Sequence, residues 1–212
     1  MAKLPDPPPP HALRRHSPGK HTHVLPRGTW LWRIYQSAGA HPTTWSSLRT
    51  FGPSGSRFDH HEPPPHEQAR GILYAGTGRR AIRTCLAEVF QATRAVDRTR
   101  DQPWLVGFRL VAPVSLLDLR GVWPTRAGAS QAIATGPHAR ARVWSRAIYA
   151  AYPAIGGLLY RSSMNASEPA VALYERAGAA LPRAPQFHRA LGDPAVLRVL
   201  LGECAALGYC LL

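Results

Sequence analysis

The chain has 212 residues, and its 26 lysine and arginine side chains outnumber 12 aspartates and glutamates, giving a formal net charge of +14. Hydrophobic residues make up 45% of the sequence, which excludes a wholly disordered chain. The apolar runs are much shorter than the roughly 20 residues that a membrane span requires. No apolar segment follows the first charged residues, so we expect no secretory signal. Together these features predict a single soluble, basic domain.

Residues 1–25 are rich in proline and histidine and show no apolar periodicity. Such a segment cannot bury enough apolar surface to offset the entropy lost on ordering. The sequence therefore predicts a mobile tail over residues 1–25 and a folded domain over residues 26–212. The histidines of the tail could bind a transition metal, but the sequence favours a solvated tail over a metal site.

Residues 29–35 are aromatic and β-branched, which predicts a strand with Trp30, Trp32 and Ile34 on one face. Arg33 then points to the opposite face, which is either solvated or the lining of a cavity. The following stretch, residues 39–68, is rich in glycine, proline, serine and histidine and is predicted to be a loop. It carries Arg57, and loops of this length are more often functional than idle.

Residues 71–75 form a short apolar run, and glycines then turn the chain into a predicted helix over residues 80–93. The apolar residues of this helix recur on one arc. At about 100° per residue, Glu88 lies just outside the edge of that arc. Its carboxylate is therefore either at the helix surface or at the mouth of a cleft.

The rest of the chain alternates apolar runs with amphipathic segments, which indicates an α+β domain. The predicted elements are strands at 103–111, 114–119, 156–160 and 170–174, and helices from 136 to 151 and from 193 to 210. The strands at 156–160 and 170–174 have a hairpin-like relation. We find no internal repeat, no P-loop and no dinucleotide fingerprint.

Cysteine and histidine give no metal-binding pattern. Cys85, Cys204 and Cys210 are an odd number without CxxC spacing, so neither a disulfide framework nor a metal site is expected and a reducing cytoplasm fits best. His60 and His61 are adjacent, but no acidic–histidine motif frames them. The positive charge is nearly all arginine, which suits nucleic acid, an anionic small molecule or an acidic protein partner alike.

Six short segments occur in an order and spacing that resemble the RES-domain family, the toxins of RES–Xre toxin–antitoxin modules. The matching segments are Leu31-Trp-Arg-Ile, Ser56-Arg-Phe-Asp, Gly71-Ile-Leu-Tyr-Ala, Leu86-Ala-Glu-Val-Phe, Leu117-Asp-Leu and Gly157-Leu-Leu-Tyr-Arg-Ser162. The resemblance runs from about Thr29 to the C-terminus and excludes residues 1–25. It implies an ADP-ribosyltransferase-like α+β fold with a central β core and flanking helices.

The resemblance also implies an activity, namely cleavage of the bond between nicotinamide and ribose in NAD+ by phosphorolysis or hydrolysis. NAD+ is then the substrate, with inorganic phosphate as a possible co-substrate and no bound cofactor. The implied catalytic residues are Glu88, Arg33 and Ser162, and the implied NAD+-binding residues are Arg33, Arg57, Tyr74 and Ser162. Ser162 is preferred to Ser163 because it preserves the Tyr-x-Ser spacing, and Tyr35 either shares the site or only packs.

The same resemblance implies a cognate antitoxin with a helix-turn-helix domain that blocks the NAD+ entrance in the cytoplasm, with no membrane partner. DNA binding would then belong to the antitoxin. Two other functions stay open from the sequence. One is transfer of ADP-ribose to a macromolecule on the same fold. The other is a nonenzymatic nucleic-acid-binding module, which the +14 charge suggests.

Overall fold

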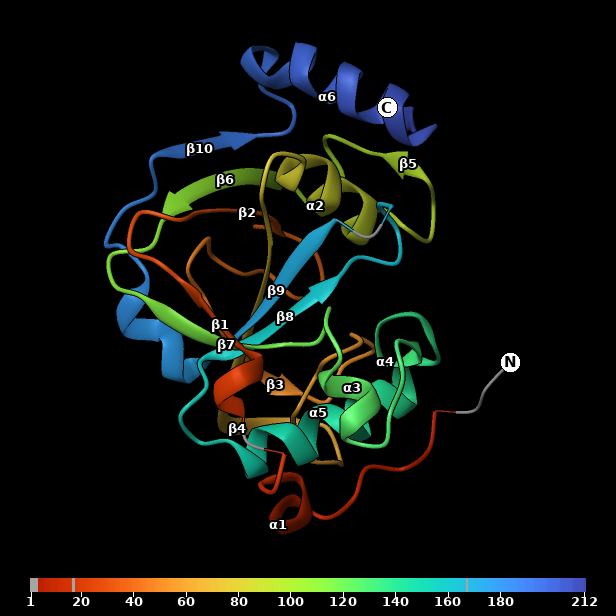
Figure 1. The fold of residues 1–212 in the computed structure, drawn as a ribbon. Coiled ribbons are helices and arrows are strands. Elements are labelled where there is room, and N and C mark those ends of the chain that lie inside the picture. The colour runs from red at the N-terminus through yellow and green to blue at the C-terminus, as the bar shows by residue number, and fades with distance from the viewer. Residues whose placement is uncertain (1–3, 17, 167) are drawn as a thin grey trace.

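The structure, a computed structural model, describes residues 4–16, 18–166 and 168–212. It contains one nine-stranded sheet, one two-stranded sheet and a set of helices around them (Figure 1). The α-helices are α1 (Pro10–Leu13), α2 (Ala81–Val89), α3 (Trp123–Arg126), α4 (Ala132–Thr135), α5 (His138–Ala151) and α6 (Pro194–Leu207), and the 3-10 helices are η1 (Pro18–His21) and η2 (Glu175–Ala180). The strands are β1 (Thr22–Leu25), β2 (Trp30–Gln36), β3 (Arg49–Gly52), β4 (His66–Thr77), β5 (Ala95–Val96), β6 (Pro103–Arg109), β7 (Val114–Asp118), β8 (Gly157–Arg161), β9 (Pro169–Tyr174), β10 (Phe187–Ala190) and β11 (Cys210–Leu211).

The large sheet has the strand order β1-β7-β8-β9-β4-β2-β6-β10, and β3 pairs with β4 beside this path. It nearly divides between β4 and β2, which share only the register pairs Leu31↔Thr77 and Trp32↔Gly76. Beyond these pairs β2 follows β6 while β4 follows β9. The two halves of the sheet face each other across a common apolar core. A split in the sheet is thereby left at the point where β2 and β4 separate.

Helices cover the outer faces of both halves, as Figure 1 shows with α2 and α6 at one end and α5 at the other. On the β4–β9 half, α5 buries Trp144 and Ile148. On the β2–β6 half, Leu86 of α2 and Leu200 of α6 pack with Ile34 of β2. The alternation of side chains along a strand lets each half contribute to the shared core and to an outer helix layer.

Local sequence fixes where two of the helices, α6 and α2, begin. Asp193 caps α6 by accepting a hydrogen bond from the backbone N–H of Ala195, as the Asp–Pro start signal predicts. A Cβ at Gly76 would lie 2.5 Å from the carbonyl oxygen of Ala81, so a glycine is required where α2 begins against β4. This close approach sets α2 directly beside the split.

The structure confirms most of the predicted elements. Strands form within or around all of the predicted apolar runs, and β8 and β9 are an antiparallel pair. Helices α2, α5 and α6 occupy the predicted segments, although α2 ends at Val89, before the expected residue 93. The predicted loop over residues 39–68 is wrong in part, since it contains β3 and the start of β4. Their pairing with each other supplies order that their polar composition conceals.

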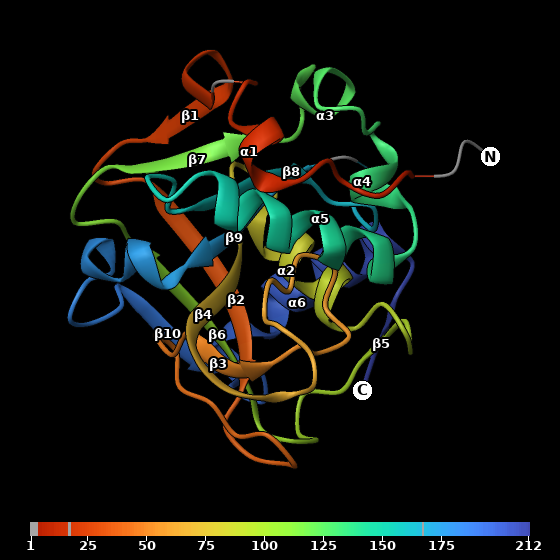
Figure 2. The same cartoon turned by 90° about the horizontal axis from the view of Figure 1, so that it is seen from below.

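The prediction of a mobile tail over residues 1–25 is wrong for the residues in this range that the structure describes, 4–16 and 18–25. Leu4 and Leu13 are buried in the core beneath α5, and Tyr152 donates a hydrogen bond to the Leu13 carbonyl at 2.6 Å. Trp144 likewise donates to the Pro5 carbonyl at 2.8 Å. Figure 2 shows α1 beside α5 and β1 beside β7. Two buried leucines, hydrogen bonds to backbone carbonyls and the pairing of β1 with β7 therefore order this segment, although it has no apolar periodicity.

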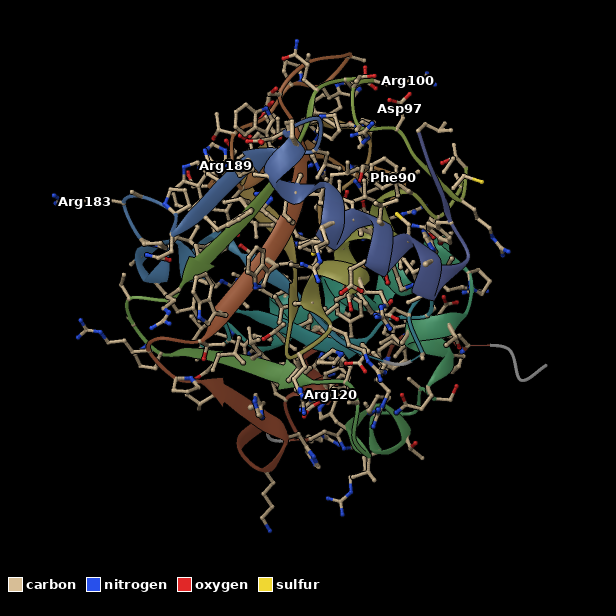
Figure 3. All side chains as sticks on the ribbon, turned by 90° about the horizontal axis from the view of Figure 1, so that it is seen from above. Phe90, Asp97, Arg100, Arg120, Arg183 and Arg189 are labelled. Carbon is tan, nitrogen blue, oxygen red and sulfur yellow. The ribbon has the colours of Figure 1, made fainter. Side chains whose placement is uncertain are left out.

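The positive charge is spread over separate elements. Arg100, Arg183 and Arg189, labelled in Figure 3, are all exposed and come from the loop before β6, the segment before β10 and β10 itself. Within the described ranges, no helix is both long and apolar enough to cross a membrane.

Candidate active site

A cleft of about 270 Å³ opens where β2 and β4 separate, and α2 and the α4–α5 segment complete its walls. Arg33, Arg57, Tyr74 and Glu88 all line it. Ser162 is buried and makes a hydrogen bond to Glu88 behind this wall. The five residues named from the sequence, which come from five separate segments, therefore meet in one place.

Arg33 projects from β2 into the cleft, which decides between its two predicted settings in favour of the cavity. Its Nη1 donates to the backbone carbonyls of Trp45 at 3.0 Å and Ser47 at 3.2 Å, and its buried Nε has no hydrogen-bond partner in the described chain. Burial lowers the pKa of Arg33 to about 10, so the guanidinium remains charged at neutral pH. Two carbonyls thus orient the group while Nε stays unpaired, as expected of a donor reserved for an anion.

Arg57 also lines the cleft and lies in the loop between β3 and β4. Its Nη1 donates to the backbone carbonyl of Gly136, just before α5. Burial lowers the pKa of Arg57, and the nearby Glu88 carboxylate opposes that shift. The two arginines therefore bring two positive charges to a cleft that holds one carboxylate, Glu88, among its lining residues. Such a charge balance suits a substrate with more than one negative charge.

Glu88 is held by a short hydrogen bond. The hydroxyl of Ser162 donates to Glu88 Oε1 at 2.5 Å. Ser162 Oγ in turn accepts from the backbone N–H groups of Met164 and Asn165 at 3.2 Å and 3.1 Å. The single proton of Ser162 is therefore committed to the carboxylate. Ser163, the alternative serine, lines the cleft with an exposed side chain and makes no contact of this kind. The geometry favours Ser162 as the partner of Glu88.

Two tyrosines provide aromatic surface. Tyr74 of β4 lines the cleft, and its buried hydroxyl has no hydrogen-bond partner among the residues described. Burial raises its pKa far above the usual value, so it stays a neutral phenol. Tyr160 of β8 also lines the cleft and packs on Phe58 with ring centroids 4.6 Å apart. Burial likewise raises the pKa of Tyr160, and the Glu88 charge adds to that shift.

Sequence reasoning missed Tyr160 and His138 as cleft residues. Tyr160 belongs to the family segment Gly157–Ser162, and its position two residues before Ser162 was the only sequence signal for it. His138 is the first residue of α5, and its position depends on tertiary packing. Its Nδ1 lies 2.8 Å from the Gly55 carbonyl oxygen. Nothing in its local sequence pattern points to a site.

Cys85 also lines the cleft but is unsuited to be a nucleophile. Its Sγ donates to the Trp32 carbonyl at 3.0 Å. Burial raises the pKa of the thiol to about 12, so the reactive thiolate is scarce at neutral pH. Tyr35 lies on the side of β2 that faces the shared core and is buried, and its hydroxyl lies 2.7 Å from His188 Nε2. Its ring also lies beside Arg33, whose Cζ is 5.9 Å from the ring centroid, so Tyr35 packs against a residue that lines the cleft.

Of the two adjacent histidines, both of which are buried, His61 belongs to a structural group of polar side chains. Asp59 Oδ1 lies 2.5 Å from His61 Nδ1, and Asp59 Oδ2 accepts from Arg49 at 2.8 Å; we call these three residues the Asp59 cluster. These hydrogen bonds and the Arg49 charge outweigh burial and lower the pKa of Asp59 far below its usual value. In the described part of the chain, no three His, Cys, Asp or Glu side chains gather as a metal-binding group.

Comparisons with known proteins identify the family and the fold. The family model described as the RES domain matches residues 31–192. A chain in the solved M. tuberculosis MbcT–MbcA toxin–antitoxin complex superimposes with a TM-score of 0.57 at 15% identity, covering 90% of this chain and 97% of that chain. No curated protein matches the sequence. The expected ADP-ribosyltransferase-like α+β fold, a central sheet with flanking helices, is confirmed. Since the family model spans most of the chain, the protein belongs to the RES-domain family.

Proposed function

We propose that this protein is the toxin of a toxin–antitoxin module and that it destroys NAD+ by cleaving the bond between nicotinamide and ribose. The observation that carries the proposal is the fixed Glu88 carboxylate, which faces a cleft lined by two arginines and two tyrosines. Membership of the RES-domain family supports it. So does the fold shared with a chain from a toxin–antitoxin complex.

The walls of the cleft suit the two ends of the substrate. Arg33 and Arg57 present guanidinium groups, which bind a pyrophosphate in a bidentate geometry that lysine cannot reproduce. The nicotinamide ring of NAD+ is positively charged, and the face of an aromatic ring attracts a cation. Tyr74 provides such a ring on β4.

Cleavage of this bond develops positive charge on the ribose, as in glycoside hydrolysis. The electron pair of the C–N bond leaves with nicotinamide, which becomes neutral. Glu88 stabilises the oxocarbenium-like ribose through its negative charge, and Ser162 keeps the carboxylate in place. An acceptor oxygen then bonds to C1′ of the ribose. A water oxygen loses a proton to solvent in this step, whereas inorganic phosphate attacks through an oxygen that is already deprotonated.

The acceptor comes from outside the protein. Cys85 is a neutral, hydrogen-bonded thiol, and the proton of Ser162 is committed to Glu88, so neither is an activated nucleophile. We propose water or inorganic phosphate as the acceptor, which makes the enzyme an NAD+ glycohydrolase or an NAD+ phosphorylase. NAD+ is then a substrate, and no cofactor is required.

A cognate antitoxin with a helix-turn-helix domain is the proposed partner, and it neutralises the toxin in the cytoplasm by covering the cleft entrance. The solved neighbour comes from a complex of this general kind, which supports a protein partner. DNA binding by the module would reside in that antitoxin.

The test is release of nicotinamide from NAD+ by the purified protein, with and without inorganic phosphate, beside the variant Glu88→Gln. Release that requires Glu88 supports the proposal, and its dependence on phosphate identifies the acceptor. The same assay with NAD+ labelled in its ribose distinguishes ADP-ribosyl transfer, because the label would then become covalently attached to protein or nucleic acid. No release by the folded, antitoxin-free protein overturns the proposal.

A further inference from the structure

The turn between β8 and β9 is fastened to α2 by three polar contacts in a regular series. Ser162 donates to Glu88 at 2.5 Å, Asn165 Nδ2 donates to Thr84 Oγ1 at 3.0 Å, and Arg80 Nη1 donates to Glu168 Oε1 at 3.0 Å. Helix α2 contributes residues 84 and 88 and its N-cap contributes residue 80, while the turn contributes residues 168, 165 and 162. We call these contacts the α2–turn ladder.

The spacing explains why the three contacts form together. Residues four apart on an α-helix lie on one face, about one turn from each other. The turn runs antiparallel to α2 along that face and closes on itself, because the Ser162 N–H donates to the Glu168 carbonyl and the Glu168 N–H donates to the Asn165 carbonyl, both at 2.8 Å. The described residues of the turn, 162–166 and 168, therefore lie along a single face of the helix.

The middle contact is the most buried of the three. Thr84 is 1% exposed and Asn165 5% exposed, whereas the Arg80 side chain is 54% exposed. Thr84 Oγ1 donates to the Arg80 carbonyl at 3.1 Å while accepting from Asn165, so its proton and an acceptor site are both used. A buried hydrogen bond with both partners satisfied is expensive to disrupt, because a single loss leaves a buried polar atom unpaired.

The ladder ends at the proposed catalytic carboxylate. Ser162 is oriented by the N–H groups of Met164 and Asn165, and Asn165 is oriented in turn by Thr84. A shift of the turn relative to α2 would therefore move the Ser162 hydroxyl away from Glu88. Displacement of a catalytic group by about 1 Å can reduce the rate about 10²-fold.

Resting on the function proposed above, we propose that Thr84 and Asn165 are positioning residues, whose hydrogen bond docks the β8–β9 turn on α2 and so sets the Ser162–Glu88 contact. Neither residue binds the substrate in this role. Thr84 borders the cleft, but its hydroxyl is already committed to Arg80 and Asn165.

The test compares Thr84→Val with the conservative variant Thr84→Ser. Valine has nearly the shape of threonine but lacks the hydroxyl, whereas serine keeps it. Glu203→Gln is the matched control, since Glu203 accepts from Arg83 at 2.6 Å and fastens α2 to α6 on another side of the helix. Kinetics of nicotinamide release and amide hydrogen exchange over the β8–β9 turn are measured for each protein, below its thermal midpoint.

We expect Thr84→Val to lower kcat about tenfold with the KM for NAD+ within about twofold, because the arginine contacts are untouched. Exchange at the turn amides should rise in the same variant. Thr84→Ser should restore both readouts, and Glu203→Gln should change neither. Should Thr84→Val fail to fold, Arg80→Gln removes the outer, exposed contact and should give the same pattern with a smaller fall in kcat.

An unchanged kcat in Thr84→Val, a rise in KM alone, or a failure of Thr84→Ser to restore kcat would overturn the positioning role. A uniform loss in Glu203→Gln would also overturn it, because general loosening of α2 would then be the cause. If the parent protein releases no nicotinamide, the proposed function fails, while hydrogen exchange still reports whether Thr84 docks the turn.

Discussion

The cleft and the Asp59 cluster use the same kinds of side chain in opposite ways, although Arg57 of the cleft is only two residues before Asp59 in the sequence. In the Asp59 cluster, the carboxylate is fully buried and each of its oxygens accepts hydrogen bonds, from His61 and from Arg49 and the Ser54 N–H. In the cleft, the buried Nε of Arg33 has no partner in the described chain. Charges that neutralise one another hold the fold, whereas charges kept apart and facing a cavity are available to a ligand.

His61 and Ser162 show the same contrast between a polar group that holds the fold and one that faces the cleft. His61 lies between Asp59 and the Arg70 carbonyl, with both ring nitrogens occupied. This arrangement holds the loop that carries Arg57 against β4. Ser162, in contrast, directs its proton to a carboxylate that borders open space. The comparison predicts that variants of the Asp59 cluster change stability and variants of the cleft change activity.

The largest expected effect is on stability, in Asp59→Asn. The amide would set an NH2 group against one of the donors that Asp59 now accepts from, and would remove the charge that pairs with Arg49. Breaking a buried ion pair from one side costs about 3–5 kcal/mol. Denaturant unfolding should show this loss in the free energy of unfolding. A loss below about 1 kcal/mol, the range of exposed ion pairs, would show that the cluster does not hold the fold.

The next effect is on activity, in Glu88→Gln. Removal of one well-placed electrostatic contact lowers the rate about 10²–10³-fold. The glutamine side chain has the same size and can still accept from Ser162, so the free energy of unfolding should stay close to that of the parent. Steady-state nicotinamide release and denaturant unfolding test the two halves of this prediction. Full activity in Glu88→Gln would contradict the proposed mechanism.

Much of the fold could be predicted because its strands carry continuous apolar runs and its long helices carry clear apolar arcs. The β8–β9 pairing followed from two such runs around a polar turn. The N-terminal segment and β10 could not be predicted in the same way. Leu4 and Leu13 are isolated among prolines and polar residues, and only the surface of α5 gives them a place to pack.

The candidate site shows the same division. Arg33 and Glu88 were each predicted with two alternatives, because the periodicity of one strand or helix does not show what lies opposite. The split between β2 and β4 decides both, and it is a property of the sheet as a whole. His138 reaches the cleft only because α5 packs across the β4–β9 half, so no local pattern could reveal it.

A third effect is a change in the pH dependence of stability. His60 is fully buried and stacks on Tyr149 with ring centroids 4.3 Å apart. Neither ring nitrogen has a hydrogen-bond partner in the described chain, and Glu175 Oε2 lies 3.8 Å from Nε2. Burial lowers the pKa of His60 to about 3. The unfolded chain takes up a proton near pH 6.5. The folded state does not, so stability falls as pH drops from about 6.5 towards 3.

In His60→Phe this contribution should disappear, because phenylalanine retains the stacking but does not titrate. Between pH 4.5 and 6, the free energy of unfolding of the parent should fall relative to the variant by about 1.4 kcal/mol per pH unit. Parallel slopes for the parent and His60→Phe would show that His60 is protonated in the fold.

A smaller effect is expected on substrate binding, in Arg33→Lys. Lysine keeps the positive charge but loses the planar fork that donates to two carbonyls and leaves Nε for an anion. Loss of one hydrogen bond to a charged group corresponds to a rise in KM of roughly tenfold. Steady-state kinetics should show this rise with a smaller change in kcat. A fall in kcat alone would place Arg33 at the chemical step rather than at the pyrophosphate.

The smallest effect is expected in Cys85→Ser, which tests whether every polar group in the cleft takes part in the reaction. Serine preserves a donor to the Trp32 carbonyl and removes only the thiol. Because the pKa of the thiol is raised to about 12, the thiolate contributes nothing at neutral pH. Nicotinamide release should therefore stay within about twofold of the parent, provided that the variant is folded. A fall in the rate of nicotinamide release as large as that of Glu88→Gln would show that Cys85 takes part in the reaction, although its thiol is neutral and hydrogen-bonded.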